Sequence, residues 1–446
     1  MTTGPEPGSR IAAAPVSRRS ASGMKRSMAF LVLAEMAAMS LWFVSAAVVP
    51  EIQAEAELSP VMTASLSSAV QVGFVIGALL FAVHGTPDRY DPRVVFAVSA
   101  LGAALCNAAL LVTPLGDPIQ VVLRGLTGAL LAGVYPVGMK IAVGWSVRRR
   151  GLLVGLIVGA LTLGSAAPHL IAFAGGADWR FTVSVASLLA VTAAGLIAFT
   201  RLGPLHAMAP ALDPMALKLV WTQPAIRFAY LGYLCHMWEL YAFWAWIAVA
   251  AAISFGPYWG DAAGDAARLT AFAAIALGAL VCVPVGAFAD RLGKARLAGW
   301  CLAGSAAAAF ATALSFAGPP WLTILCILLW GALVIPDSAQ FSALVADAAP
   351  RDRAGSLMTF QTALGFLLTA FTVQAAPMLA DRLGWAGTLA ILGIGPVIGV
   401  EMMRRLHALR WRPATPMQIR PPHAPRQGNG VRRRQRTSST ENPRKE

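Results

Sequence analysis

Apolar segments of membrane-spanning length dominate this sequence. A transmembrane helix needs about 20 consecutive, mostly apolar residues. Two sets of six such segments can be marked, at 27–49, 61–84, 93–112, 121–146, 151–173 and 181–199, and at 225–253, 269–288, 298–316, 321–345, 354–380 and 386–403. Only 13 % of the residues are charged, about half the share that soluble domains carry. We therefore predict an all-α integral membrane protein with twelve transmembrane helices.

Polar stretches divide the chain around these segments. We expect a cytoplasmic N-terminal tail (1–26), a six-helix bundle (27–199), a cytoplasmic linker (200–224), a second six-helix bundle (225–403) and a basic, disordered cytoplasmic tail (404–446). The first apolar segment is too long for a signal-peptide core, so it is expected to stay as the first transmembrane helix. The last stretch is rich in Pro and Arg and has too few apolar residues to fold.

Basic residues alternate between the two ends of the predicted bundle. The loops after helices 2, 4, 6, 8 and 10 hold thirteen Lys and Arg, whereas the opposite loops hold only Arg180, Arg268 and Arg382. By the positive-inside rule, both termini face the cytoplasm, and the protein is expected in the plasma (inner) membrane. The net charge of +14 therefore encodes topology, and we expect no nucleic-acid partner.

Enzymatic and metal-binding signatures are missing from the sequence. The five cysteines lie in apolar segments without CxxC spacing, so we interpret them as small core residues. There is no GxxxxGK[ST] loop for ATP and no HExxH or GxSxG for hydrolysis. We expect no enzymatic activity, no cofactor and no metal.

The two halves of the sequence carry matching landmarks. Glu35 and Glu239 lie 204 residues apart, and each precedes a tryptophan by seven residues. Gly85 and Gly286 follow the second helix of each set, 201 residues apart. Near-constant offsets indicate two parallel, pseudo-symmetric six-helix repeats. Glycines spaced four residues apart on the second and fifth helices, such as Gly73 and Gly77 or Gly155 and Gly159, predict close helix packing.

The loop after the eighth helix carries the most specific motif. Its sequence, Gly286-Ala-Phe-Ala-Asp290-Arg291-Leu-Gly293-Lys294-Ala-Arg296, resembles the G-x-x-x-D-R-x-G-[RK]-x-[RK] signature of the major facilitator superfamily (MFS). That resemblance implies a conformational latch between neighbouring helices and the MFS fold over about residues 27–405. The first-half copy keeps Gly85, Asp88 and Arg89 but departs from the pattern after them. Loop charges that only set topology are the alternative interpretation.

Arg124 begins a second motif, Arg124-Gly-Leu-Thr-Gly128, which resembles the superfamily motif whose buried arginine is linked to proton coupling. The alternative is an arginine that extends to the lipid headgroups. The fifth helix only partly resembles the antiporter motif, because Ala160 stands where proline is expected. Export cannot be inferred from it, and His169 in the same helix is interpreted as structural or interfacial.

Charged side chains inside apolar segments are costly and usually functional. The candidates for substrate binding and proton coupling are Glu35, Arg124, Lys140, His236, Glu239 and Asp337. The resemblance places the first helix of each three-helix repeat around a central cavity, with Trp42, Tyr135, Trp238 and Tyr241 as candidate lining residues. We predict that Glu35 pairs with Lys140, and that Glu239, one turn from His236, is the better proton carrier. Static buried pairs are the alternative.

These features favour a secondary active transporter that moves a small solute by alternating access, coupled to protons. One rival is a proton-driven exporter of cationic or apolar compounds, with Glu35, Glu239 and Asp337 as countercharges. An importer of anions would instead depend on Lys140 and Arg124. A non-transporting membrane sensor is the rival from another class. The expected partners are a small solute, H+ and the lipid bilayer, and we expect a monomer.

Overall fold

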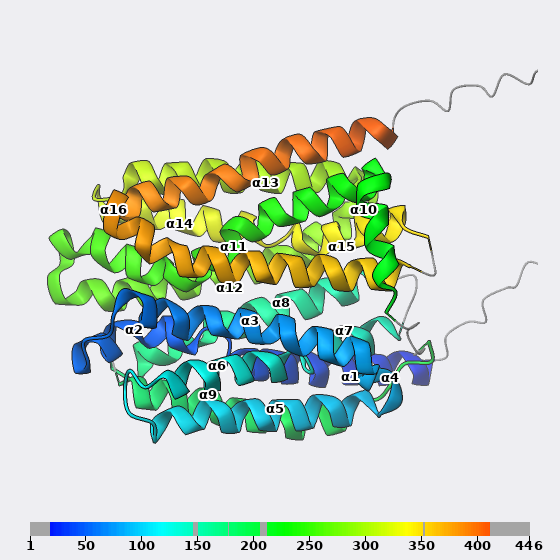
Figure 1. Cartoon of the computed structure of the whole chain (residues 1–446), viewed down its shortest axis with the longest axis horizontal. Coiled ribbons are helices and arrows are strands. Elements are labelled where there is room, and N and C mark those ends of the chain that lie inside the picture. Colours follow the sequence, from blue (N-terminus) through cyan, green and yellow to red (C-terminus); the bar gives the residue numbers. More distant parts are fainter. Residues whose placement is uncertain (1–17, 146–149, 177, 206–211, 351–352, 411–446) are drawn as a thin grey trace, which may run out of the picture. The chain divides into compact units, whose positions relative to one another are not determined.

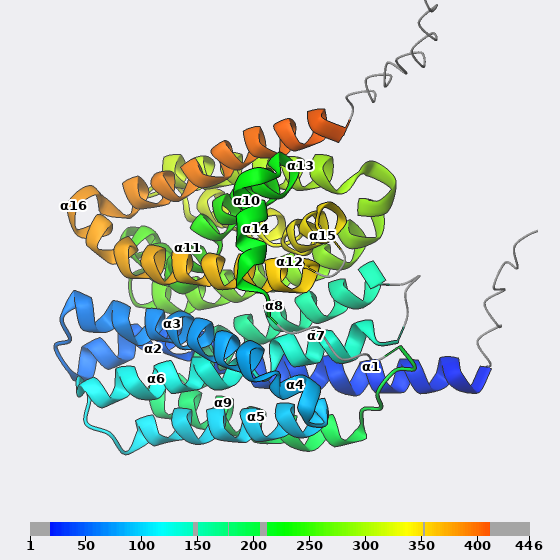
Figure 2. The same cartoon turned by 45° about the vertical axis from the view of Figure 1, so that its right-hand side comes forward.

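The computed structural model describes residues 18–145, 150–176, 178–205, 212–350 and 353–410. Within these ranges the regular secondary structure is helical, and the long helices run roughly side by side (Figure 1). Figure 2 shows the same packing after a 45° turn. Both sets of six helices belong to one compact unit, which ends at Leu409.

Six membrane-spanning segments make up the first half. They are α1 (Arg18–Met39) with α2 (Val44–Glu55), α3 (Pro60–His84), α5 (Pro92–Ala108), α6 (Pro118–Leu131) with α7 (Tyr135–Val143), α8 (Arg150–Ala174) and α9 (Trp179–Leu196). The short α4 (Thr86–Arg89) lies between α3 and α5, and 3-10 turns extend α5 (Ala109–Leu111) and α9 (Ile197–Phe199).

The second half repeats this arrangement after a 3-10 turn (Pro214–Leu217) and α10 (Lys218–Thr222). Its segments are α11 (Pro224–Trp259), α12 (Ala263–Leu292), α13 (Lys294–Ser315), α14 (Pro320–Val334) with α15 (Ser338–Ala348), and α16 (Ala354–Arg410). Among the described residues, ten continuous stretches are long and apolar enough to span a membrane. Two of these stretches contain two spanning helices each, because the chain turns at Gly260 between α11 and α12 and at Gly384 inside α16. The twelve-helix prediction is confirmed.

Helix starts follow directly from the local sequence. The side chains of Ser59, Asp91 and Asp117 each accept a backbone N–H of the helix that follows. Each is followed by proline, which fits the first helical position because its missing N–H is not needed there. Asp178 caps α9 in the same way without a proline.

Three spanning segments are interrupted near their middles. The α1–α2 segment breaks at Ser40–Phe43, α6–α7 at Ala132–Val134 and α14–α15 at Ile335–Asp337. Proline explains two of the breaks, at Pro136 and Pro336, because it removes a backbone N–H from the helix. In lipid, freed backbone groups are tolerated only where protein or an internal cavity surrounds them. The breaks therefore mark the protein-facing interior.

Small residues allow the closest helix contacts. A Cβ on Gly73 or Gly77 of α3 would overlap the α6 backbone at Gly125 or Ala129. On α8, a Cβ at Gly159 would lie 3.3 Å from the Ala279 carbonyl of α12. The predicted close packing is confirmed, and the α8–α12 contact joins the two halves.

Candidate functional site

Arg124 of α6 is fully buried and binds backbone carbonyls at the break in the first spanning segment. Its guanidinium donates to the carbonyls of Leu41 (3.0 Å) and Trp42 (2.8 Å), and to Asn107 Oδ1 at 3.0 Å. The α1–α2 break frees those carbonyls, so the cation satisfies backbone acceptors that helix geometry leaves open. The alternative of an arginine that extends to the headgroups is wrong, because no part of Arg124 is exposed.

Glu35 of α1 is also fully buried. Neither carboxyl oxygen makes a hydrogen bond with any residue that the structure describes. Oε2 lies against Gly138 of α7, where a Cβ would overlap it, and Tyr135 lies within electrostatic range. The predicted Glu35–Lys140 pair does not form here, and Lys140 is half-buried further along α7.

His236 and Asp337 meet across the interior of the second half. The Nδ1 atom of His236 on α11 lies 3.0 Å from Oδ1 of Asp337, at a direction outside good hydrogen-bond alignment. Asp337 occupies the α14–α15 break, at the N-cap position of α15. Both side chains are almost completely buried. The sequence names both residues but pairs His236 with Glu239, and the break at Pro336 brings Asp337 there instead.

Glu239 has its own set of partners. One carboxyl oxygen accepts a hydrogen bond from Ser305 Oγ of α13 (2.7 Å), and the other accepts one from the Trp330 indole N–H of α14 (2.9 Å). The sequence does not predict these partners. Ser305 and Trp330 lie in apolar segments, and no spacing relates them to Glu239.

Six rings form an aromatic cluster that spans both halves: Trp42, Phe43, Phe74, Tyr241, Trp244 and Phe366. The Trp42 ring lies 5.0 Å from Phe74 in the first half and 5.7 Å from Tyr241 in the second. The cluster brings together two of the four predicted lining residues. Tyr135 begins α7 near Glu35, whereas Trp238 donates to the Ile391 carbonyl and packs against α16.

A second contact between the halves lies at the end of the molecule opposite the basic loops. Glu51 of α2 forms a largely buried ion pair with Arg268 of α12. Arg268 also binds Asp265 at 2.8 Å. Close to this end, Ser68 of α3 donates to Gln374 of α16 at 2.8 Å. These contacts close the two halves together at this end.

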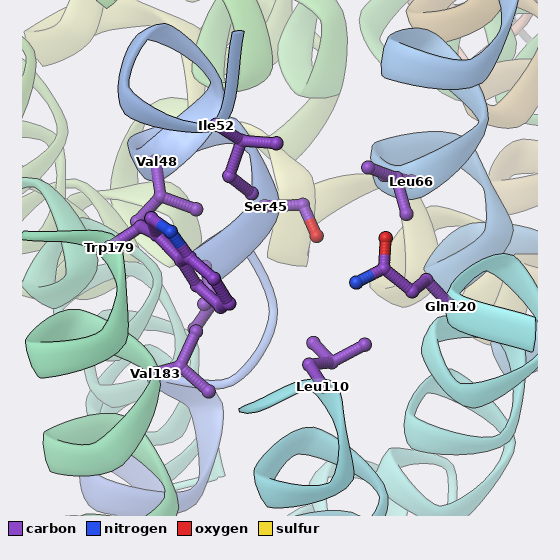
Figure 3. A pocket seen from close by; sticks show the side chains of 9 residues that line it. Ser45, Val48, Ile52, Leu66, Leu110, Gln120, Trp179 and Val183 are labelled. Carbon is purple, nitrogen blue, oxygen red and sulfur yellow. The ribbon is translucent and has the colours of Figure 1, made fainter. Parts of the chain in front are cut away.

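A small cavity lies inside the first half, between α2, α3, α6 and α9. The Ser45 hydroxyl and the Gln120 amide point into it between Leu66, Leu110 and Trp179 (Figure 3). Its volume of about 20 Å³ holds roughly one water. We therefore do not assign it to a transported solute.

Residues 31–373 match the family model described as Major Facilitator Superfamily. The chain belongs to this superfamily. It is thus a multi-pass membrane transporter by family and fold. No curated protein matches its sequence.

Solved transporters of the superfamily share the fold. A structure titled D-xylose-proton symporter has a TM-score of 0.68 and 16 % identity, and the alignment covers 86 % of this chain and 98 % of that one. The proton:xylose symporter XylE bound to 6-bromo-6-deoxy-D-glucose gives 0.67 and 15 %, with 87 % and 99 % covered. XylE from E. coli in a partially occluded, inward-open conformation gives 0.64 and 16 %, with 88 % and 99 % covered. At such identities the likeness shows the fold alone.

The superfamily loop signature is ordered around ion pairs in this transporter. Gly85 and Gly293 adopt positive φ angles of 59° and 88° at the helix junctions, which glycine allows without strain. Lys294 binds Asp347 of α15 at 2.8 Å. In the first-half copy, Asp91 binds Arg93 at 2.6 Å. The sequence assigns no role to Asp91 or Asp347.

The structure describes only some of the side chains of the remaining predicted latch residues. Gly286 is buried on α12, whereas Arg89 and Arg291 are exposed. An Arg296 side-chain nitrogen lies 3.2 Å from His407 Nε2 of α16. The side chains of Asp88 and Asp290, both in the predicted latch, lie outside the described residues. The latch role therefore stays a prediction.

Proposed function

We propose that this chain is a proton-coupled secondary active transporter, in which the bundles 27–199 and 225–403 alternate access for a small solute. Superfamily membership and fold support transport. The excess of basic residues at one end supports cytoplasmic termini in a plasma membrane. The working partners are the solute, H+ and the bilayer, around a monomer.

The burial of Glu35 without a partner carries the proton-coupling proposal. Removing a carboxylate from water costs several kcal/mol unless partners compensate for the lost hydration. No described residue offers Glu35 a hydrogen bond. A bound proton removes that cost in this conformation, and an opening that admits water allows the proton to leave. The carboxyl is thus suited to take up a proton in one state and release it in the other.

Glu239 and the His236–Asp337 pair support the same proposal from the second half. Glu239 accepts hydrogen bonds from Ser305 on α13 and Trp330 on α14, so movement of either helix changes its surroundings. Asp337 lies in a helix break, where a small backbone movement changes its distance to His236. We propose Glu35 and Glu239 as proton carriers, with His236 and Asp337 as a coupled pair.

The test is solute transport in proteoliposomes with imposed gradients. A thermal-shift screen of small anions, cations and drugs on purified protein first supplies a ligand, because ligands of the native state stabilise it. We expect Glu35→Gln and Glu239→Gln to abolish accumulation driven by a pH gradient. Solute exchange without a gradient should persist, because glutamine keeps the shape of the side chain but cannot carry the proton.

The matched control is Glu57→Gln, because Glu57 is an exposed carboxylate. It should behave as the unmodified protein. Unchanged gradient-driven accumulation in both Glu35→Gln and Glu239→Gln would reject the proton carriers. Absence of solute movement under every gradient, with ligand binding intact, would favour a sensor.

A further inference from the structure

Four polar side chains are buried in and beside the aromatic cluster: Trp42 and Trp244 belong to it, and Ser165 and His169 lie on α8. The indole N–H groups of Trp42 and Trp244 and the Ser165 hydroxyl find no hydrogen-bond partner among the residues that the structure describes, and His169 lies beside them on the backbone of Trp244. All four side chains are 1 % exposed or less. Buried polar groups are nearly always paired in folded proteins. Such a group of unpaired atoms is explained by a ligand that completes it.

These side chains come from three elements that meet at the α1–α2 break. Trp42 lies in the break, and its neighbour Phe43 packs edge-on against Trp244 of α11 at 5.8 Å. Ser165 and His169 lie one turn apart on α8. Beside them, a Cβ on Gly164 would overlap the Met36 carbonyl, so this part of α8 packs directly on the end of α1.

His169 also approaches α11, because its ring lies next to the backbone of Trp244. The group therefore includes α8 and the α1–α2 break from the first half and α11 from the second. A solute bound between these elements would contact both halves. Its binding and release would thus depend on their relative movement.

The chemistry of the unpaired atoms defines the ligand. An indole N–H can only donate a hydrogen bond, so the two tryptophans require acceptor atoms on the solute. Rings packed edge-on and tilted offer faces and edges to a flat ring of the ligand. Tyr241 and Phe366 continue this aromatic surface, at 5.7 Å and 5.4 Å from Trp42.

The local charge favours an anion. The Arg124 guanidinium lies on the carbonyls of Leu41 and Trp42, and no carboxylate in the described part of the chain pairs with it. A buried cation whose charge has no acidic counterpart attracts a negative ligand across a medium of low dielectric constant. An organic cation would meet N–H donors and this positive charge, so the exporter of cationic compounds is disfavoured.

We propose that Trp42, Trp244, Ser165 and His169 form the solute site, and that the solute is a planar organic anion such as an aromatic carboxylate. The proposal rests on the transporter function above and names its substrate class. A proton on Glu35, seven residues before Trp42 on the same segment, then accompanies the anion and reduces the net charge that crosses the membrane.

The experiment measures binding by thermal shift on the purified, full-length protein. The probes are benzoate and 4-hydroxybenzoate, compared with benzylamine and benzamide at equal concentrations. We expect the carboxylates to raise the melting temperature and benzylamine to leave it unchanged. Trp42→Phe and Trp244→Phe keep the ring and remove the N–H group, so each should weaken carboxylate affinity by about tenfold, the usual value of a hydrogen bond to a charged group.

The matched control is Trp246→Phe on α11. Trp246 is buried like Trp244, but its N–H already donates to the Val373 carbonyl at 2.9 Å. Its replacement should lower stability and leave carboxylate affinity unchanged. Stabilisation by benzylamine alone, no stabilisation by either carboxylate, or carboxylate affinity that stays at the level of the unmodified protein in both Trp42→Phe and Trp244→Phe would overturn the proposed site. Carboxylate binding without gradient-driven transport would contradict the transporter function and leave the site intact.

Discussion

At the scale of single residues, the buried polar groups of this protein are of two kinds: those with hydrogen-bond partners and those without. Arg124 satisfies two carbonyls freed by the α1–α2 break and also binds Asn107. Glu35 lies on the α1–α2 segment that Arg124 stabilises, and its carboxyl oxygens accept no hydrogen bond from a described residue. Buried polar groups that are fully paired fix one structure, whereas an unpaired one is available for a proton or a solute. We therefore assign Arg124 to structure and Glu35 to transport.

This assignment predicts the effect of Arg124→Lys on stability. Lysine keeps the charge but lacks the planar fork that reaches several acceptors at once. Each buried acceptor left unpaired costs about 1–3 kcal/mol, so the melting temperature of the purified protein should fall clearly. The control, Arg180→Lys, changes an exposed arginine bound to Glu55, where the cost should stay within about 1 kcal/mol. Equal losses in the two variants would contradict a structural role for Arg124.

At the scale of elements, interrupted helices and glycine contacts position the site. Each break brings a functional group inward: Trp42 at the first, Tyr135 beside the second and Asp337 at the third. The α3 and α6 backbones touch where Gly73 meets Gly125 and Gly77 meets Ala129, next to Arg124 and just before the second break. The packing of helices in lipid depends on such contacts, since no hydrophobic force drives them together.

Gly73→Ala tests that contact. A Cβ at this position would overlap the carbonyl of Gly125, so α3 and α6 must separate. We expect a loss of about 1–3 kcal/mol, as overpacking usually costs. Gly195→Ala on α9 is the control, because a Cβ there meets no atom within 4 Å. It should be neutral or stabilise the helix slightly. A neutral Gly73→Ala would show that the helices tolerate separation.

At the scale of the whole molecule, the sequence predicts the topology better than the contacts. Segment length, charge asymmetry and the loop motif are local patterns, so twelve helices and the superfamily could be predicted from them. The buried residues Glu35, Arg124, His236, Glu239 and Asp337 are also visible as polar groups in apolar segments. Their partners are not, because pairs such as Glu239 with Trp330 depend on helix rotation and on the breaks. The break at Ser40–Phe43 contains no proline or glycine, so no local signal predicts it.

The Glu51–Arg268 ion pair connects the two halves and gives a prediction about the whole molecule. Alternating access requires one end to open while the other closes, and this buried pair lies at the end that is closed here. Without the Glu51 charge, Arg268 keeps only Asp265 of its own half as a partner, so the attraction that holds α2 on α12 is lost and the closed conformation is destabilised. We expect Glu51→Gln to open this end, and to speed backbone hydrogen exchange at the C-terminal part of α2 and the start of α12.

Glu55→Gln is the matched control for this measurement. Glu55 also lies on α2 and binds an arginine, but its partner Arg180 belongs to the same half. Its replacement should leave exchange at the start of α12 unchanged. The charge-reversed double variant, Glu51→Arg with Arg268→Glu, should restore protection on both helices, because the attraction between the halves returns. Unchanged exchange in Glu51→Gln would contradict the view that this pair holds the halves together, and would assign the closure to the aromatic cluster and the α8–α12 contact.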